Sequence, residues 1–440
     1  MRNRNETGIP RSKLVVVSMD GLSEREMFAA ARLPGFRNLL ERGTSFGTLR
    51  GIYPTVTYVA HATLMTGRFP EDHGITSNHP LQPGIPTSKQ SWHWYASELR
   101  CPTLFDLARD RGLTTAAVLW PLSAGGRVTW NFPEIAALPG ENQTLKVLNT
   151  GSPGFLVSLE RKFRKYRKGQ EQPYLDEYIS RCAAYTIRSR KPHLLMTHLL
   201  ALDDAKHRCG SESPEAREAL AVLDGGLVRI LEAIEEAGEQ DSTTIVVIGD
   251  HGHIYIDRRV RLNGLLEGVG LCGLLDGEFR WRAWFQCSGG SAFLHIKKGD
   301  SKAVGEARDL LETARRDPDI GIRQVYEGAE LRALRCGTEA SFAVDAQPGV
   351  QFLEDTDGRF IEVSPGRGAF GADHGYTPDL PGYRSLFLAA GPGIAQGSAP
   401  EEACLEDVAP TLARALGLTF PTAEGDGIPV FLHSRQAVYA

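Results

Sequence analysis

The sequence predicts an α/β fold, with a mostly parallel central sheet, helices on both of its faces, and a smaller inserted α+β subdomain. Short, continuously apolar segments of strand length alternate with segments of helical periodicity along most of the chain. Such strands are typical of parallel sheets that are buried on both faces. With 440 residues, 42% hydrophobic and 23% charged, the chain can form one large domain or two to three ordinary ones.

The expected elements follow in order from periodicity and end signals. The segment at 214–237 is the clearest amphipathic helix, with Leu220, Leu223, Leu227 and Ile230 at steps of three and four. The expected helix at 57–65 ends at Gly67, a residue that favours helix termination. Strands are expected at 14–19, 114–120, 193–200, 243–248 and 385–390, and further helices at 34–41, 102–111, 174–190 and 408–416.

One section departs from this alternation. Residues 254–360 contain Gly-rich segments and then a βαβ-like unit at 292–296, 302–315 and 322–326. We therefore predict a catalytic core at 11–253 and 361–435, with 254–360 as the inserted subdomain. The long segments 78–100 and 123–154 are expected to be loops that face a substrate.

Charge and composition exclude several classes. The chain has 49 basic and 54 acidic residues, net −5, so nucleic acid is not expected as a partner. No apolar run approaches the ~18 residues that span a bilayer. No signal peptide is visible, which predicts a cytoplasmic protein, or an exported one if a leader has been removed. The seven cysteines form no Cys-x-x-Cys pair and are expected to be reduced thiols.

A basic run lies at 161–168, with six basic and two aromatic residues in eight. A solvated helix face is the favoured interpretation. Contact with nucleic acid or acidic lipid is the alternative.

Metal-type ligands follow the apolar strands. Asp20 ends the first strand, Asp203 and His207 follow the strand at 193–200, and Asp250-His251-Gly252 follows the strand at 243–248. A Gly-bracketed His374 and a hydroxyl, Thr57, at the start of a helix complete the set. Because ligands bind beyond the carboxyl ends of parallel strands, these side chains are expected to meet at one edge.

The ligand types indicate the chemistry. Aspartate and histidine without cysteine suit divalent metals, zinc above all. Three aspartates and three histidines exceed the needs of one tetrahedral ion and are sufficient for two. Two metals flanking a phosphoryl group are a known arrangement for in-line displacement.

The motifs resemble those of the nucleotide pyrophosphatase/phosphodiesterase branch of the alkaline phosphatase superfamily. The most specific stretch runs from Tyr53-Pro54-Thr55-Val56-Thr57 to His73-Gly74-Ile75, and Trp120-Pro121, Asp250-His251-Gly252 and His374-Gly375-Tyr376 also match. The resemblance implies an alkaline-phosphatase-like core and a small phosphate ester, such as a nucleotide, as substrate. No sulfatase-type Cys/Ser-x-Pro-x-Arg is present.

The resemblance also implies roles for individual residues. One zinc ion would be held by Asp203, His207 and His374, and the other by Asp20, Asp250, His251 and the hydroxyl of Thr57. Asn78 would hold a phosphoryl oxygen. The chain departs from many relatives in having Lys206, rather than glycine, before His207. Asp204 remains an alternative to Asp203, and Lys206 could alter the charge that the substrate meets.

The expected mechanism starts from Thr57. Zinc would lower the pKa of its hydroxyl, the resulting alkoxide would attack phosphorus, and water would then release the product from phospho-threonine. Tyr58, Trp120 and His253 are candidate substrate contacts, against a default of ordinary packing. We expect hydrolysis of phosphodiester or pyrophosphate bonds. A phosphomonoesterase or phosphonate hydrolase on the same site is the alternative, and a non-catalytic nucleotide-binding relative is a third.

Overall fold

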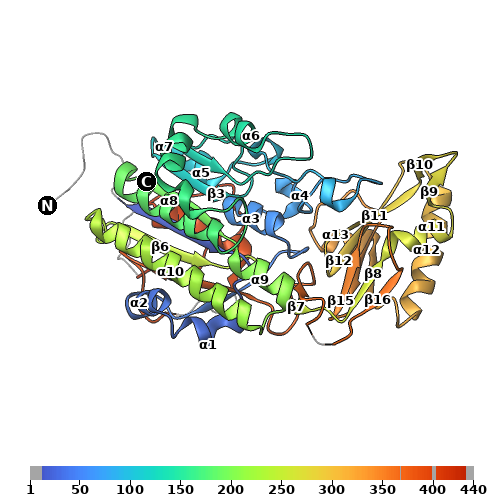
Figure 1. Ribbon diagram of the computed structural model, residues 1–440. Coiled ribbons are helices and arrows are strands. Elements are labelled where there is room, and N and C mark those ends of the chain that lie inside the picture. Colours follow the sequence, from blue (N-terminus) through green and yellow to red (C-terminus); the bar gives the residue numbers. More distant parts are fainter. Residues whose placement is uncertain (1–11, 367, 399–402, 433–440) are drawn as a thin grey trace.

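The computed structural model describes residues 12–366, 368–398 and 403–432 (Figure 1). Its largest sheet has the order β19-β2-β18-β6-β1-β5-β3-β4, and β6, β1, β5, β3 and β4 run parallel. This confirms the predicted mostly parallel sheet. Its strands are β1 (Lys13–Met19), β2 (Gly47–Arg50), β3 (Thr115–Trp120), β4 (Trp130–Pro133), β5 (Leu194–Leu199), β6 (Thr243–Ile248), β18 (Ser385–Ala390) and β19 (Ala403–Cys404).

Helices cover both faces of this sheet, as predicted. Alternate residues of β1 point to opposite faces, so Leu14 and Val16 belong to one hydrophobic cluster and Val15 and Val17 to another. The first cluster contains α3 (Thr57–Thr66), α5 (Leu104–Asp110) and α14 (Val408–Ala415). The second contains α2 (Pro34–Arg42), α8 (Tyr174–Arg190) and α10 (Pro214–Glu236). Burial on both faces explains why the strands lack polar alternation.

The strand at 385–390 corrects one expectation. Its continuously apolar sequence indicated a parallel strand, but β18 runs antiparallel to β6. The chain reaches β18 from β17 (Ala372–Asp373), which pairs with β7 (Ile254–Tyr255), the strand that follows β6 in the chain. It therefore enters the sheet from the opposite end to the parallel strands. An apolar run indicates that a strand is buried, but it does not indicate the direction of that strand in the sheet.

A second, smaller sheet lies at the side of the molecule that carries the yellow and orange segments in Figure 1. Its order is β11-β12-β14-β13, all antiparallel. The predicted βαβ-like unit corresponds to β12, α12 and β13, but β14 lies between the two strands. The proposed division at 254 and 360 stays a prediction, and its residues 11, 367, 399–402 and 433–435 lie outside the described part. The elements are β11 (Ala283–Cys287), β12 (Ser291–Ile296), α12 (Ser301–Arg316), β13 (Ile322–Glu327) and β14 (Phe342–Ala346).

The expected loop at 123–154 is wrong in part. It contains the edge strand β4, the helix α6 (Gln143–Thr150) and the first residues of α7 (Pro153–Phe163). Asn142 caps α6 by accepting a hydrogen bond from the backbone N–H of Leu145 at 3.0 Å. Both α6 and α7 contact β4, and packing of an amphipathic face supplies most of the stability of short helices.

The remaining elements are short, apart from α9 (Ala201–Cys209), which follows β5. They are α1 (Met27–Ala30), α4 (Pro70–His73), α11 (Leu262–Gly268), α13 (Gly328–Ala333), β7 (Ile254–Tyr255), β8 (Arg258–Arg261), β9 (Cys272–Leu275), β10 (Glu278–Trp281), β15 (Val350–Leu353), β16 (Ile361–Val363), and 3-10 turns at Glu24–Glu26, Thr87–Lys89, Ala96–Glu98, Arg164–Tyr166 and Leu405–Asp407.

Two further expectations concern cysteines and membrane segments. All seven cysteines are free thiols, as predicted. No helix in the described ranges combines the length and the apolar character that crossing a bilayer requires.

The basic run at 161–168 covers the end of α7 and the following turn, and its lysines and arginines are exposed. Three of its lysines lie over the rings of Tyr185, Tyr166 and Tyr174.

Candidate functional site

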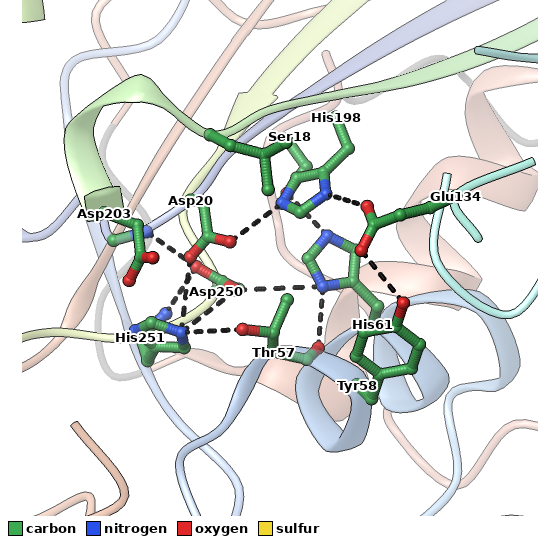
Figure 2. A network of polar contacts seen from close by, with 12 residues as sticks. Ser18, Asp20, Thr57, Tyr58, His61, Glu134, His198, Asp203, Asp250 and His251 are labelled. Carbon is green, nitrogen blue, oxygen red and sulfur yellow. Dashed lines mark hydrogen bonds and ion pairs between the residues drawn. The ribbon is translucent and has the colours of Figure 1, made fainter. Parts of the chain in front are cut away.

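The candidate site lies at the edge of the main sheet where the parallel strands β5, β1 and β6 end (Figure 2). Asp20 directly follows β1, and Asp250 and His251 follow β6. Helix α9, which begins two residues after β5, carries Asp203 and His207 one turn apart. The register of the sheet therefore brings together side chains that are up to about two hundred positions apart in the sequence.

Asp20, Asp250 and His251 form the first group of candidate ligands, and their ligand atoms lie within 4.8 Å of one another. His251 Nε2 is 3.3 Å from both Asp20 Oδ1 and Asp250 Oδ2. The same nitrogen lies 3.2 Å from the hydroxyl oxygen of Thr57. The predicted zinc-holding set of Asp20, Thr57, Asp250 and His251 is thus gathered at one point.

The electrostatics of this group favour the binding of a positive charge. Burial, followed by repulsion from Asp203 and Asp250, raises the pKa of Asp20 well above its ordinary value. Burial also raises the pKa of Asp250. Burial lowers the pKa of His251 to about 3, so its ring is neutral and a competent ligand.

Asp203, His207 and His374 form the second predicted group. His207 Nε2 lies 3.2 Å from Asp203 Oδ1, and the rings of His251 and His374 stack with centroids 3.9 Å apart. Burial by itself lowers the pKa of His207, but the charge of Asp203 outweighs it and raises that pKa to about 10. Burial lowers the pKa of His374 to about 4.

The position of His374 depends on the segment that precedes Thr57. The backbone carbonyl of Thr55 accepts a hydrogen bond from the N–H of Gly375 at 2.9 Å and lies 3.1 Å from His374 Nδ1. The hydroxyl of Thr55 donates to the carbonyl of Tyr376 at 2.8 Å. One short segment therefore places both the candidate nucleophile and a distant candidate ligand.

Two residues join the second group that the sequence did not assign to it. His253 Nε2 is 2.9 Å from Asp203 Oδ1, and Asp373 Oδ1 is 3.6 Å from His207 Nδ1. Both can contribute to a set of potential ligands with Asp203, His207 or His374. His253 lies two residues after His251, and Asp373 directly precedes His374. This proximity to predicted ligands is the signal in the sequence that could have identified them.

The observed donor atoms fit two divalent cations. Asp20 Oδ1 and Asp250 Oδ2 are buried without a hydrogen bond, although buried carboxylate oxygens are normally paired. Oxygen and imidazole nitrogen donors without sulfur suit zinc or a related divalent metal. Asp204 points elsewhere, since it pairs with Arg208 at 2.6 Å, so the geometry favours Asp203 of the two alternatives.

Lys206 does not face the site. Its ammonium is fully buried and pairs with Glu26 Oε1 at 2.8 Å, while also donating to the carbonyl of Gly21 at 2.8 Å. Glu26 therefore balances the charge of Lys206 away from the site, and the bond from Lys206 to Gly21 links α9 to the turn after β1. The expected influence on the substrate is replaced by a structural contact.

Thr57 begins helix α3, where backbone N–H groups are unpaired within the helix. The side-chain oxygen of Asn78 accepts a hydrogen bond from the N–H of Tyr58 at 2.9 Å. Because the Asn78 oxygen accepts this hydrogen bond, its carboxamide N–H group is the part that can donate to a ligand. Asn78 thus lies beside Thr57, as its predicted role requires.

A chain of polar contacts behind Asp20 was missed by the sequence analysis (Figure 2). His198 Nε2 lies 3.2 Å from Asp20 Oδ2, and His198 Nδ1 lies 2.7 Å from Glu134 Oε2. Burial lowers the pKa of His198, but Glu134 and Asp20 outweigh it and raise that pKa well above its usual value. The signal for His198 in the sequence is its position inside an otherwise apolar strand, β5.

His61 lies on the other side of His198, with ring centroids 4.5 Å apart. Its Nδ1 is 2.7 Å from the carbonyl of Thr57, and its Nε2 is 2.9 Å from the Ser18 hydroxyl. Burial lowers the pKa of His61 well below its ordinary value. The neutral ring therefore supports the first turn of α3.

The three predicted substrate contacts have different positions. Tyr58 lines a cleft beside the site, and its hydroxyl donates to Glu134 Oε1 at 2.9 Å. The indole of Trp120 is fully buried against His61, at a centroid distance of 5.0 Å, and is not part of the lining of this cleft. His253 is also fully buried, among the candidate ligands rather than at the surface.

Fold and site together define an α/β protein with paired metal-type ligands around a helix-starting threonine. Residues 14–377 match the family model of type I phosphodiesterase / nucleotide pyrophosphatase. The chain therefore belongs to this family.

Curated relatives match part of the chain, and solved structures share its fold. Venom phosphodiesterase 2 of Crotalus adamanteus is 24% identical over 252 residues, 56% of this chain and 27% of that protein. Human ectonucleotide pyrophosphatase/phosphodiesterase family member 1 is 24% identical over 255 residues, 56% of this chain and 24% of that protein. The matches thus span about a quarter of these relatives. Murine ectonucleotide pyrophosphatase/phosphodiesterase 5 has a similar fold, with a TM-score of 0.64 at 19% identity, covering 94% of this chain and 97% of that chain.

Proposed function

We propose that this protein is a two-zinc hydrolase that cleaves phosphodiester or pyrophosphate bonds in nucleotide-type substrates through a phospho-threonine at Thr57. The observation that carries the proposal is the position of the Thr57 hydroxyl, 3.2 Å from His251 Nε2 and beside two unpaired buried carboxylate oxygens. Family membership supports the reaction class. A relative, murine ectonucleotide pyrophosphatase/phosphodiesterase 5, was solved as an inactive form in complex with AMP, which supports nucleotide-type substrates.

The chain supplies the positions for an in-line displacement. Divalent cations held by the two ligand groups would supply positive charge that lowers the pKa of the Thr57 hydroxyl and stabilises the departing oxygen. Asp20, Asp250 and His251, which form one candidate group, would hold one cation. Asp203, His207 and His374 would hold the other; each two of them share a candidate group with a third residue, which is His253, His251 or Asp373. Because both groups lie beside the start of α3, the phosphoryl group would sit between them and Thr57.

Thr57 and Asn78 perform the steps that involve the protein's own atoms. The Thr57 hydroxyl loses its proton to water and a bond forms between Thr57 Oγ1 and phosphorus. At the same time the bond from phosphorus to the leaving oxygen breaks, and that oxygen departs with the electron pair. The Asn78 carboxamide N–H donates to a non-bridging oxygen, with its orientation fixed by the Tyr58 N–H. Water then cleaves the Oγ1–phosphorus bond and regenerates the threonine hydroxyl.

Turnover of chromogenic esters tests the proposal. Zinc-loaded protein is expected to hydrolyse bis-p-nitrophenyl phosphate faster than p-nitrophenyl phosphate, and Thr57→Ala is expected to abolish this hydrolysis while retaining the fold. Intact-mass spectrometry of a quenched reaction should detect one phosphoryl adduct on the wild type and none on Thr57→Ala. Unchanged hydrolysis by Thr57→Ala would exclude the mechanism.

A further inference from the structure

The end of helix α7 and the turn that follows it form a strongly cationic surface that the proposed reaction does not use. Six exposed basic side chains lie there within eight positions: Arg161, Lys162, Arg164, Lys165, Arg167 and Lys168. We call these six residues the basic surface. Because the whole chain carries a net charge of −5, this positive charge is a local property of one part of the molecule.

Five of the six charges on the basic surface form no ion pair with an aspartate or glutamate in the described part of the chain. Only Arg167 has such a partner, Glu160, at 2.8 Å. An exposed helix whose charges simply face water usually carries both signs, which pair along the helix. Helix α12 is an example, since Lys302 pairs there with Glu306 at 3.5 Å. The excess of unpaired cations therefore argues against a solvated helix face as the full interpretation of the basic surface.

Tyrosine rings hold the three lysines of the basic surface in place. The ammonium groups lie 4.9, 5.0 and 3.8 Å from the ring centroids of Tyr185, Tyr166 and Tyr174, respectively. Such contacts are attractive, but they do not compensate the positive charge with an anion. The three rings are also partly buried, whereas proteins that bind single-stranded nucleic acid offer open rings on which bases stack. The basic surface is therefore better suited to the anions of a lipid surface than to nucleic acid.

Exposed apolar side chains lie next to the basic surface. Val157, one turn before Arg161 on the same face of α7, is 49% exposed. Leu145 on α6 is 58% exposed, and α6 contacts α7 (Figure 1). The inner face of α7 packs into the core through Phe155 and Leu159. Cations and apolar groups that share an exposed face are typical of helices that bind a membrane surface.

We infer that the basic surface docks this protein on an anionic lipid bilayer. The unpaired cations would lie against the phosphate and carboxylate groups of the lipids, and Val157 and Leu145 would enter the headgroup region. Because the charges are exposed, salt should screen the attraction. Neither Thr57 nor any candidate metal ligand belongs to this surface, so the inference does not depend on the proposed hydrolysis.

Co-sedimentation of the 440-residue chain with lipid vesicles tests this inference. Vesicles of phosphatidylcholine with about one-third phosphatidylserine present an anionic surface, and vesicles of phosphatidylcholine alone are the neutral reference. Each cation close to an anionic surface strengthens binding about fivefold, so the anionic vesicles should bind the protein at least about 100-fold more tightly than the neutral ones. Raising the salt concentration from about 0.1 M to about 1 M should remove most of this difference.

Two triple variants with the same net charge locate the binding surface. The first replaces three cations of the basic surface: Arg161→Gln, Lys162→Gln and Lys165→Gln. It should bind anionic vesicles about 100-fold more weakly than the wild type, because three cations are lost. The matched control replaces three exposed lysines at the end of β12 and the start of α12: Lys297→Gln, Lys298→Gln and Lys302→Gln. It should bind like the wild type, and thermal melting checks the folding of both variants.

The outcomes separate this inference from its alternatives. Equal binding of the wild type to anionic and neutral vesicles, or equal weakening by the two triple variants, would overturn it. If a single-stranded DNA oligonucleotide binds the wild type but not the first triple variant, and neither kind of vesicle binds, the surface belongs to nucleic acid instead. The proposed function is tested independently, since hydrolysis of bis-p-nitrophenyl phosphate requires neither vesicles nor the basic surface.

Discussion

The buried His198 pairs with the partly exposed Glu134, whose Oε2 lies 2.7 Å from His198 Nδ1. The other ring nitrogen of His198 faces Asp20 Oδ2 at 3.2 Å, and the other oxygen of Glu134 accepts the Tyr58 hydroxyl at 2.9 Å. One carboxylate therefore contacts both a cleft residue and the histidine that orients a candidate metal ligand. Carboxylate–histidine contacts of this kind fix the orientation of groups that bind metals.

Replacing Glu134 with glutamine is expected to weaken zinc binding about 10–100-fold, because His198 loses the charge that holds it against Asp20. Chelator competition measures the affinity directly, without a turnover assay. Glu141→Gln is a matched control, since Glu141 is exposed and pairs only with Lys146 and the backbone of Leu138. Equal zinc affinities for both variants would show that the pair does not support the metal site.

Asp250→Asn is expected to stabilise the metal-free protein while weakening metal binding. Without cations, burial and then repulsion from Asp203 and Asp250 raise the pKa of Asp20, so removing one of these charges relieves the repulsion. Asparagine keeps the oxygen that accepts hydrogen bonds from the N–H groups of Gly21 and His251, each at 2.9 Å. The melting temperature should rise in EDTA, and the increase that zinc produces in the wild type should shrink. A lower melting temperature in EDTA would contradict the charge argument.

Asn78→Ala is expected to lower kcat for bis-p-nitrophenyl phosphate by about 10²–10³, the usual effect of removing one donor to a developing negative charge. The variant also loses the acceptor for the Tyr58 N–H, which should cost about 1 kcal/mol of unfolding free energy. Steady-state kinetics and urea denaturation measure the two effects separately. A change confined to KM would argue against a role in the transition state.

Gly375→Ala is expected to destabilise the protein strongly. Gly375 has φ +84°, and a Cβ there would lie 1.6 Å from the carbonyl oxygen of Ser288. Gly299 has a similar φ of +86° but no atom within 4 Å of such a Cβ. Gly299→Ala should therefore cost only about 1–2 kcal/mol of backbone strain, and Gly375→Ala more than about 3 kcal/mol. Urea denaturation compares the two, and equal losses would show that the segment after His374 can move aside.

Glu354 should make the stability fall as the pH rises. Burial raises the pKa of this carboxyl to about 7 from an ordinary value of 4.5, so the folded state binds its proton more tightly than the unfolded state. The resulting stability is present below about pH 4.5 and is lost as the pH rises through about 7, a difference of about 3 kcal/mol.

The Glu354 prediction is checked by urea denaturation of the wild type and Glu354→Gln between pH 5 and 8. The difference in unfolding free energy between them should change in favour of the variant as the pH rises. A constant offset is expected in addition, because Gln90, Trp284 and the N–H of Cys287 all donate to Glu354. Glu330→Gln, at an exposed position, serves as the control, and a pH-independent difference for Glu354→Gln would refute the prediction.

The sequence by itself determined the parallel core and the seven residues gathered at its edge. Strands such as β1 are buried on both faces, so their apolar runs are easily recognised. Because β1 and β6 are parallel, Asp20 and Asp250, which follow them, lie at the same edge of the sheet, whatever the path of the intervening chain. Motif resemblance then identified Thr57 and His374, which strand geometry alone does not connect.

Only the tertiary structure decided the surroundings of that edge. The direction of β18, the insertion of β14 between β12 and β13, and the helix within 123–154 depend on contacts between distant segments. The same holds for the pair of Glu134 and His198, which lie 64 positions apart. A buried ion pair or a cleft wall is a relation between side chains that meet only after folding, and no local period or spacing in the chain records which ones will meet.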